Sequence, residues 1–267
     1  MKNLFEAASQ CLLASEVDEK LKLVKQLQVA WEQGELICEA NAELPEVLEA
    51  GHPARPELVS PRQVPRRRLG SPEGHAAMIH AIGHIEFNAI NLALDAVYRY
   101  RDLPAEYYAD WIQVAAEEVY HFSLIRERLR QLGYDYGDFP AHTGLWDLAR
   151  KTAADLLQRM ALVPRMMEAR GLDVTPGIMH KFRQIDDQQT VEILEIILRD
   201  EIGHVQAGSR WFNYVCQQRG LEPESTYLQL LTDYTGGRMN CPLHIQARLQ
   251  AGFSESELHE LKKMCAG

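Results

Sequence analysis

The sequence predicts an all-α protein built around an antiparallel four-helix bundle, and three observations support this fold class. Apolar residues recur at helical spacing along most of the chain, whereas no alternating run of β-branched residues bounded by turn residues is found. Four segments can be delimited that would form helices of about 40–50 Å at ~1.5 Å per residue. Short loops connect them, and long helices joined by short loops favour antiparallel neighbours.

The first 70 residues are expected to form a helical segment, residues 1–40, followed by a linker, residues 41–70. Ser15 is a plausible N-cap, and apolar residues recur at helical spacing after it: Val17, Leu21, Val24, Leu27 and Trp31. The linker holds five prolines, which lack a backbone donor and restrict the preceding residue. We therefore expect an extended surface segment, whose charge run Arg66–Arg68 is solvated or, as the alternative, contacts an anion.

The four-helix bundle is expected over residues 71–220. Ser71 and Pro72 provide an N-cap and a first-turn proline for its first helix, and Glu73 faces the helix dipole. Capping residues, prolines and glycines place the four helices near residues 72–101, 104–132, 145–171 and 187–219.

The third of these helices is expected to be irregular. Pro164 would kink it, and Gly171 would end it before a short helical piece restarts near Pro176. Residues 221–267 are expected to form a helical appendage, in which Ser254-x-x-Glu257 has the pattern of a capping box.

Composition excludes several classes of protein. The chain has 267 residues with 28 Lys and Arg against 38 Asp and Glu, a net charge of −10 that argues against a dedicated nucleic-acid binder. No run of 18 apolar residues and no signal-peptide core is found, so neither a membrane span nor secretion is expected. Five scattered cysteines without a C-x-x-C pattern favour reduced thiols and a cytoplasmic location.

Two motifs with metal-ligand spacing, Glu118-x-x-His121 and Glu201-x-x-His204, lie on the second and fourth predicted helices. Residues three apart share a helix face, so a carboxylate and an imidazole so placed can bind one metal ion. The motif alone is weak evidence, because about one match is expected by chance. A third match, Glu49-x-x-His52, is discounted, since Gly51 and Pro53 prevent the helix that it would require.

The other two helices supply the carboxylates that would complete a di-metal site. Such bundles take one Glu from each of two helices and Glu-x-x-His from the other two. Glu86 lies on an apolar stripe of the first helix, and Glu168 is the only Glu between Glu127 and Glu192. Glu86 and Glu118 are 32 residues apart and Glu168 and Glu201 are 33 apart. The similar spacing indicates a duplicated helical hairpin that brings each pair to one level.

Acidic residues next to the motifs are expected to support the ligands. Glu117 and Asp200 each precede a ligand glutamate and point toward an adjacent helix. Asp200 could accept the ring N–H of His121, and Glu117 that of His204, which would fix the tautomer of each ring. The alternative is that both acids are solvated surface charges.

Other side chains on the bundle helices are expected to have structural roles, the histidines in hydrogen bonds and the aromatics in packing: His80, His84, Tyr98, Tyr120, Trp111 and Trp211. A role beside a metal is the alternative for the two tyrosines. Arg165 lies three residues before Glu168 and could pair with it, with a substrate anion as the alternative partner.

Four segments, HAIGHIEFNAI, AEEVYHF, MEARGLDVTP and RDEIGHV, occur in this order in the chain. They resemble the ferritin-like protein family still carried as a domain of unknown function, over roughly residues 10–265. The resemblance implies a ferritin-like bundle with a di-iron or manganese–iron site that reacts with oxygen or peroxide. It carries over six ligands: Glu86, Glu118, His121, Glu168, Glu201 and His204. It does not imply a substrate.

The expected function is that of an oxidoreductase with two metal ions, Fe/Fe or Mn/Fe, acting on an unknown small substrate with an unknown electron donor. Three alternatives use the same fold: a ferroxidase or iron-handling protein, a tRNA hydroxylase-like enzyme, and a metal-free structural bundle. The net charge argues against the tRNA substrate, and four buried glutamates without cations argue against the metal-free bundle. A monomer or small homo-oligomer is expected.

Overall fold

The computed structural model describes residues 2–39, 47, 49–65 and 67–266, and these are predominantly helical. The chain is therefore all-α, as predicted. The strands in the described residues are two-residue segments, β1 (Lys2–Asn3) and β2 (Leu36–Ile37), which pair in parallel. No described helix combines the length and apolar character needed to cross a membrane. The chain divides into two compact units, Met1–Arg150 and Lys151–Gly267.

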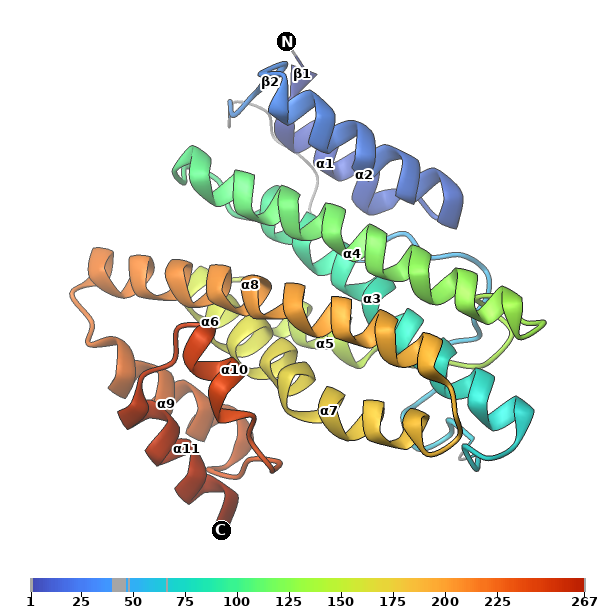
Figure 1. Ribbon diagram of the computed structural model, residues 1–267. Coiled ribbons are helices and arrows are strands. Elements are labelled where there is room, and N and C mark those ends of the chain that lie inside the picture. The colour runs from blue at the N-terminus through green and yellow to red at the C-terminus, as the bar shows by residue number, and fades with distance from the viewer. Residues whose placement is uncertain (1, 40–46, 48, 66, 267) are drawn as a thin grey trace. The chain divides into compact units, whose positions relative to one another are not determined.

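The first unit is organised around a long helical hairpin. Its two arms are α3 (Pro72–Arg99) and α4 (Ala105–Gln131), which lie side by side (Figure 1). Two shorter helices, α1 (Leu4–Leu13) and α2 (Val17–Glu32), pack on α3 and α4 respectively. The short helix α5 (Gly144–Lys151) lies at the end of this unit. The N-terminal segment is thus part of a packed layer that covers one side of the hairpin.

The sequence signals at the ends of the hairpin helices are confirmed. The Ser71 hydroxyl accepts a hydrogen bond from the Gly74 N–H at 3.1 Å, and Pro72 begins α3. Pro104 directly precedes α4. The expected cap at Ser15 is wrong by one position, because Glu16 is the N-cap of α2 and its side chain makes no capping bond.

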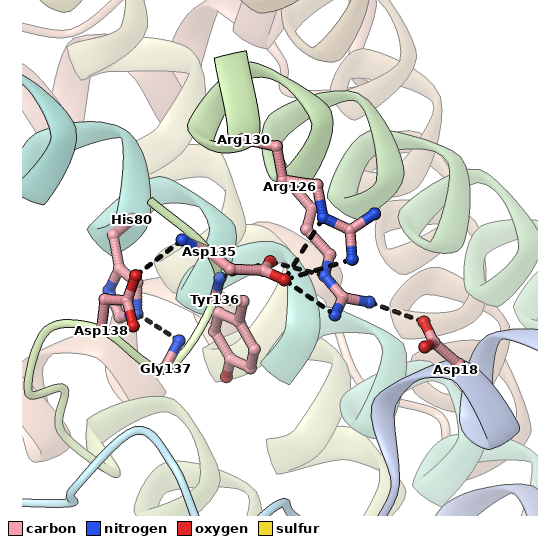
Figure 2. Close-up of polar contacts among 8 residues, drawn as sticks. All are labelled: Asp18, His80, Arg126, Arg130, Asp135, Tyr136, Gly137 and Asp138. Carbon is pink, nitrogen blue, oxygen red and sulfur yellow. Dashed lines mark hydrogen bonds and ion pairs between the residues drawn. The ribbon is translucent and has the colours of Figure 1, made fainter. Parts of the chain in front are cut away.

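Polar contacts attach the short helices and the connecting loop to the hairpin. The buried ammonium of Lys20 donates to the carbonyls of Cys11 and Leu12, at the end of α1, and to Asn91 Oδ1 on α3, all at 2.8–2.9 Å. Figure 2 shows a second network, in which Arg126 on α4 contacts Asp18 on α2 at 2.6 Å and Asp135 in the loop at 2.7 Å. These contacts keep α1 and α2 in register with α3 and α4.

The second unit contains a second helical hairpin and the C-terminal appendage. One arm is formed in turn by α6 (Leu156–Leu162), a π-helix η1 (Val163–Glu168) and α7 (Ala169–Arg183); the other is α8 (Gln188–Arg219). The two arms contact each other along their lengths (Figure 1). The appendage consists of α9 (Pro223–Thr235), α10 (Ile245–Gln250) and α11 (Glu255–Ala266). The expected division into residues 1–40, 41–70, 71–220 and 221–267 stays a prediction.

The third predicted helix differs from expectation in three places. The chain leaves helix between α5 and α6, where Asp155 caps α6. Pro164 produces a π-helical turn instead of a simple kink. The predicted break at Gly171 is wrong, since α7 continues through Gly171 and Pro176. Three buried side chains explain the continuity, because helix packing overrides the weak propensity of Gly and Pro: Leu172, Met179 and Phe182.

The C-terminal appendage bears out one sequence prediction and corrects another. The capping box is confirmed, because the Ser254 N–H donates to Glu257 Oε2 at 2.9 Å and the Glu257 N–H donates to Ser254 Oγ at 3.0 Å. The expectation of five reduced thiols is wrong, since Cys241 and Cys265 form a disulfide. The chain places these two cysteines 24 residues apart, and only the folding of the appendage brings them together.

Candidate metal centre

The first hairpin gathers three of the predicted ligands, Glu86, Glu118 and His121, which we call the first half-site. Glu86 lies 13 residues before the last residue of α3, and Glu118 lies 13 residues after the first residue of α4. Each arm therefore travels about 20 Å between its ligand and the turn. The antiparallel arms bring the two carboxylates to the same level, and His121 follows one turn later on the same face.

The first half-site is compact and almost fully buried. Glu118 and His121 are 0% exposed and Glu86 is 4% exposed. One ligand atom from each of the three side chains lies within 4.8 Å of the others. His121 Nδ1 is 3.4 Å from Glu86 Oε2 and 3.4 Å from Glu118 Oε2.

These distances fit a shared cation. Charge-assisted hydrogen bonds between a nitrogen and a carboxylate are shorter, about 2.7–2.9 Å. Two ligands bound at ~2.1 Å to one metal, at the angles of tetrahedral or octahedral coordination, lie about 3.0–3.4 Å apart. Two carboxylates and one imidazole are also a donor set that suits iron and manganese. The residues present therefore fit a metal ion.

The electrostatics of the first half-site favour a positive charge. Burial disfavours the protonated ring of His121, but the adjacent carboxylates of Glu118 and Glu86 outweigh burial and raise the pKa of His121 to about 11. The same two carboxylates would favour a metal cation in place of that proton. A metal ion would bind the neutral ring.

The second hairpin holds the remaining predicted ligands, Glu168, Glu201 and His204, which we call the second half-site. Glu201 and His204 lie one turn apart on α8, where His204 Nδ1 is 3.7 Å from Glu201 Oε1. His204 is 1% exposed, whereas the Glu201 side chain is 14% exposed. Glu168 is half-buried and ends the π-helix η1.

The second half-site is looser than the first. Among the described residues of the second unit taken alone, no three His, Cys, Asp or Glu side chains form a group as tight as the first half-site. The backbone explains part of this difference. Glu86 belongs to an uninterrupted α-helix, whereas Glu168 follows Pro164 in a wider turn, and π-helical turns occur frequently at functional sites.

The supporting acids show contacts within their own helices. Glu117 Oε1 accepts a hydrogen bond from Gln113 Nε2 at 2.8 Å. Asp200 pairs with Arg199 at 2.8 Å. The expected bonds from Asp200 to His121 and from Glu117 to His204 stay predictions.

The histidines beside Glu86 are engaged in hydrogen bonds, as predicted. His84 Nδ1 lies 2.9 Å from the Tyr136 hydroxyl, and its Nε2 lies 3.0 Å from the His142 carbonyl oxygen. His80 Nε2 accepts the Gly137 N–H at 2.9 Å (Figure 2). Burial lowers the pKa of both His80 and His84 to about 4, so both rings are neutral.

The remaining aromatic residues with a predicted packing role differ in how far they are buried. Trp111, Trp211 and Tyr98 are buried and pack in the interior, as expected. Tyr120 is 49% exposed, and its ring centroid is 6.3 Å from that of His121. Tyr120 therefore packs only in part, because this position of α4 is exposed.

Two arginine predictions are changed by the tertiary structure. Arg165 forms an ion pair with Glu257 at 2.7 Å, so the expected pairing with Glu168 is wrong. Sequence alone could not indicate this partner, which is 92 residues away. Arg67 pairs with Glu73 at 3.0 Å, whereas Arg66 lies outside the described residues.

Comparisons with known proteins support the family of unknown function to which the four segments pointed. They do not name a ferritin-like fold or a metal. A family model described as "Protein of unknown function (DUF455)" matches residues 13–259. An uncharacterized protein of Haemophilus influenzae (strain ATCC 51907 / DSM 11121 / KW20 / Rd) is 49% identical over 216 residues, which cover 78% of this chain and 75% of that protein. No solved structure matches the chain.

Proposed function

This chain belongs to the DUF455 family of proteins of unknown function, and we propose that it is a ferritin-like di-metal protein that activates oxygen or peroxide. The observation that carries the proposal is the position of His121 Nδ1, 3.4 Å from both Glu86 Oε2 and Glu118 Oε2. A buried nitrogen 3.4 Å from two carboxylate oxygens is compatible with three ligands of one shared cation.

In this proposal the six ligands together hold two ions, Fe/Fe or Mn/Fe. The ligands are Glu86, Glu118 and His121 from one hairpin and Glu168, Glu201 and His204 from the other. Four carboxylates with two neutral imidazoles would balance the charge of two divalent ions. Such a donor set leaves positions open on each ion for oxygen or substrate.

Bound iron or manganese would supply the electrons that reduce oxygen or peroxide while a small substrate is oxidised. The protein contributes the placement of the ligands and the exclusion of water. Ile82, Ala89 and Ile90 are buried on α3 around Glu86 and shield its carboxylate. Glu117 and Asp200 would accept the free ring N–H of the opposite histidine and so keep each ligand ring in one tautomer. The substrate and the electron donor are not specified by these residues.

Metal content tests the proposal directly. Protein produced with ample iron and manganese is expected to contain about two transition-metal ions per chain, measured by inductively coupled plasma mass spectrometry. Glu118→Gln keeps the shape of the side chain but removes its charge, so it should lose metal. Glu127→Gln, at an exposed position of the same helix, is the matched control and should retain metal.

The proposal is overturned if the wild-type protein contains no transition metal under these conditions, or if Glu118→Gln retains as much as Glu127→Gln. Oxygen uptake separates the enzyme from an iron-handling protein. Uptake that stops after one oxidation of the bound iron and continues only with a reductant supports catalysis. Repeated oxidation and accumulation of added iron by a large assembly supports iron handling.

A further inference from the structure

The π-helix η1 places Glu168 at a turn that needs outside support. The Ala169 N–H donates to the Pro164 carbonyl, five residues earlier, which is the hydrogen bond of a π-turn. Such turns are rare because they are less favourable than α-helix. The position of Glu168 therefore depends on what holds this turn open.

Arg165 anchors the turn in an aromatic cage. Its guanidinium carbon lies 4.2 Å from the ring centroid of Tyr227, 4.6 Å from that of Phe253 and 4.9 Å from that of Phe212. Its Nη2 donates to Glu257 Oε1 at 2.7 Å. Cation–π contacts and charge-assisted bonds are both strengthened by burial, and Arg165 is only 1% exposed.

Two further contacts hold the backbone of the turn. The Tyr227 hydroxyl donates to the Arg165 carbonyl oxygen at 2.8 Å, and Tyr227 is fully buried. Pro164 lies against Gly208 of α8, where an added Cβ would come within 2.3 Å of the proline ring. The turn is therefore held by side chains of α9 and by close contact with α8.

The partner of Arg165 is itself fixed. Glu257 uses its other oxygen, Oε2, in the capping box with Ser254 at the start of α11. In the described part of the chain, Nε and Nη1 of Arg165 have no hydrogen-bond partner. Burying those two donors costs free energy, and replacing a buried ion pair by apolar residues is often neutral or stabilising. The arrangement is thus better suited to placing the turn than to stabilising the fold.

We infer that Arg165 is a positioning residue for Glu168, and that the appendage, through Glu257 and Tyr227, sets the geometry of the second half-site. The inference rests on the proposed function, since it assigns Glu168 to a metal. If it is correct, loosening the aromatic cage around Arg165 should weaken the binding of one of the two metal ions. The metal affinity of the first half-site should not change.

Cobalt(II) titration of the metal-free full-length protein tests the inference, with visible absorption as the readout. The wild-type protein should bind two equivalents. Arg165→Met and Tyr227→Phe should weaken one of them by about 10-fold or more, the effect typical of removing a group that orients a ligand. That equivalent should also show a changed visible spectrum, and Arg165→Lys should restore part of the affinity.

Leu231→Ala is the matched control. Leu231 is fully buried in α9, one turn after Tyr227, so its truncation destabilises the appendage but leaves the contacts of Arg165 in place. It should lower the Tm at least as much as Tyr227→Phe without changing cobalt affinity. Tyr227→Phe removes a single hydroxyl and is expected to fold, so the test does not depend on Arg165→Met.

The possible results distinguish a failure of the proposed function from a failure of the role of Arg165. If the wild-type protein binds no cobalt, the proposed function fails and the inference fails with it. If the wild-type protein binds two equivalents but Tyr227→Phe binds them as tightly as Leu231→Ala does, only the inference is overturned. Faster amide exchange of residues 163–169 in Tyr227→Phe, without a change in α3 and α4, would support it further.

Discussion

The two hairpins carry the same pattern of proposed ligands on different backbones. In the first, Glu86 lies on a continuous α-helix, and its carboxylate meets Glu118 and His121 in a buried group within 4.8 Å. In the second, Glu168 lies on a π-turn. His204 Nδ1 is 3.7 Å from Glu201 Oε1, and the Glu201 side chain is partly exposed. Similar spacing along the chain therefore specifies which residues come together within a hairpin, whereas local backbone geometry specifies how closely they approach.

The largest difference is expected on removing the two histidines that we propose as ligands, His121 and His204. His121→Ala should weaken metal binding by about 100–1,000-fold, or about 3–4 kcal/mol, because it leaves the buried carboxylates of Glu86 and Glu118 without this partner. His204→Ala should cost on the order of 10-fold, because water can reach the carboxylate of Glu201 that is left behind. Calorimetric titration with Mn(II) measures both. His180→Ala, an exposed position of α7, serves as the control, and equal losses for the two ligand variants would contradict the comparison.

Acid should destabilise the first unit through His80. Burial is the main cause that lowers the pKa of His80 to about 4, and the nearby His84 is the second. Asp138 and Asp135 act in the opposite direction. The unfolded chain binds a proton at this residue below its ordinary pKa of about 6.5, whereas the folded chain does not until about pH 4. The contribution of His80 to the free energy of unfolding is therefore fully present above pH 6.5. It falls by up to about 3 kcal/mol as the pH decreases toward 4.

Urea unfolding at pH 7, 5.5 and 4.5 tests this loss. A protonated His80 could no longer accept the Gly137 N–H, whereas His80→Gln retains an acceptor that does not titrate. The free energy of unfolding of His80→Gln should therefore depend less on pH than that of the wild-type protein. The exposed His180→Gln is the control and should follow the wild-type protein. Parallel pH profiles for all three proteins would refute the assignment to His80.

Alanine substitution at one glycine in each hairpin, Gly83 and Gly208, would compare how closely the two hairpins are packed. A Cβ added at Gly208 would lie 2.3 Å from the Pro164 ring, so Gly208→Ala should force η1 away from α8 and destabilise the protein by about 1–3 kcal/mol. A Cβ added at Gly83 would come within 2.9 Å of one atom, Cγ2 of the buried Ile125. Because this contact is longer than the two at Gly208 and Ala has a better helix propensity than Gly, Gly83→Ala should cost less than Gly208→Ala. Chemical denaturation measures both, and the reverse order would contradict the packing described.

The smallest expected effects concern helix caps. Asp187 caps α8, is 5% exposed, and accepts the Thr190 N–H at 3.0 Å. Ser71 caps α3 at an exposed position. Asp187→Ala should cost about 1–2 kcal/mol and Ser71→Ala about 0.5–1 kcal/mol. Thermal unfolding followed by circular dichroism ranks them; replacement by Asn and Thr, which also cap, should recover most of each loss.

Local signals explain which parts of the fold could be predicted. Ser71, Pro104 and Gly220 mark helix ends because capping depends on residues within one turn. Local signals predicted a wrong helix end where packing competed with helix propensity. In α7 the helix continues through Gly171 and Pro176. The group of Glu86, Glu118 and His121 was predictable because helical periodicity and a short turn place its members together.

By itself the sequence determined the all-α class, the helical hairpins and the identity of the buried acidic and imidazole groups, because these depend on periodicity and on residues close along the chain. The tertiary structure decided the π-turn before Glu168, the pairing of Arg165 with Glu257 and the Cys241–Cys265 disulfide. The ion pair and the disulfide join segments distant in sequence, and the π-turn is held by such contacts, so no local rule specifies them. The physical reason is that long-range partners are selected by the packing of whole helices.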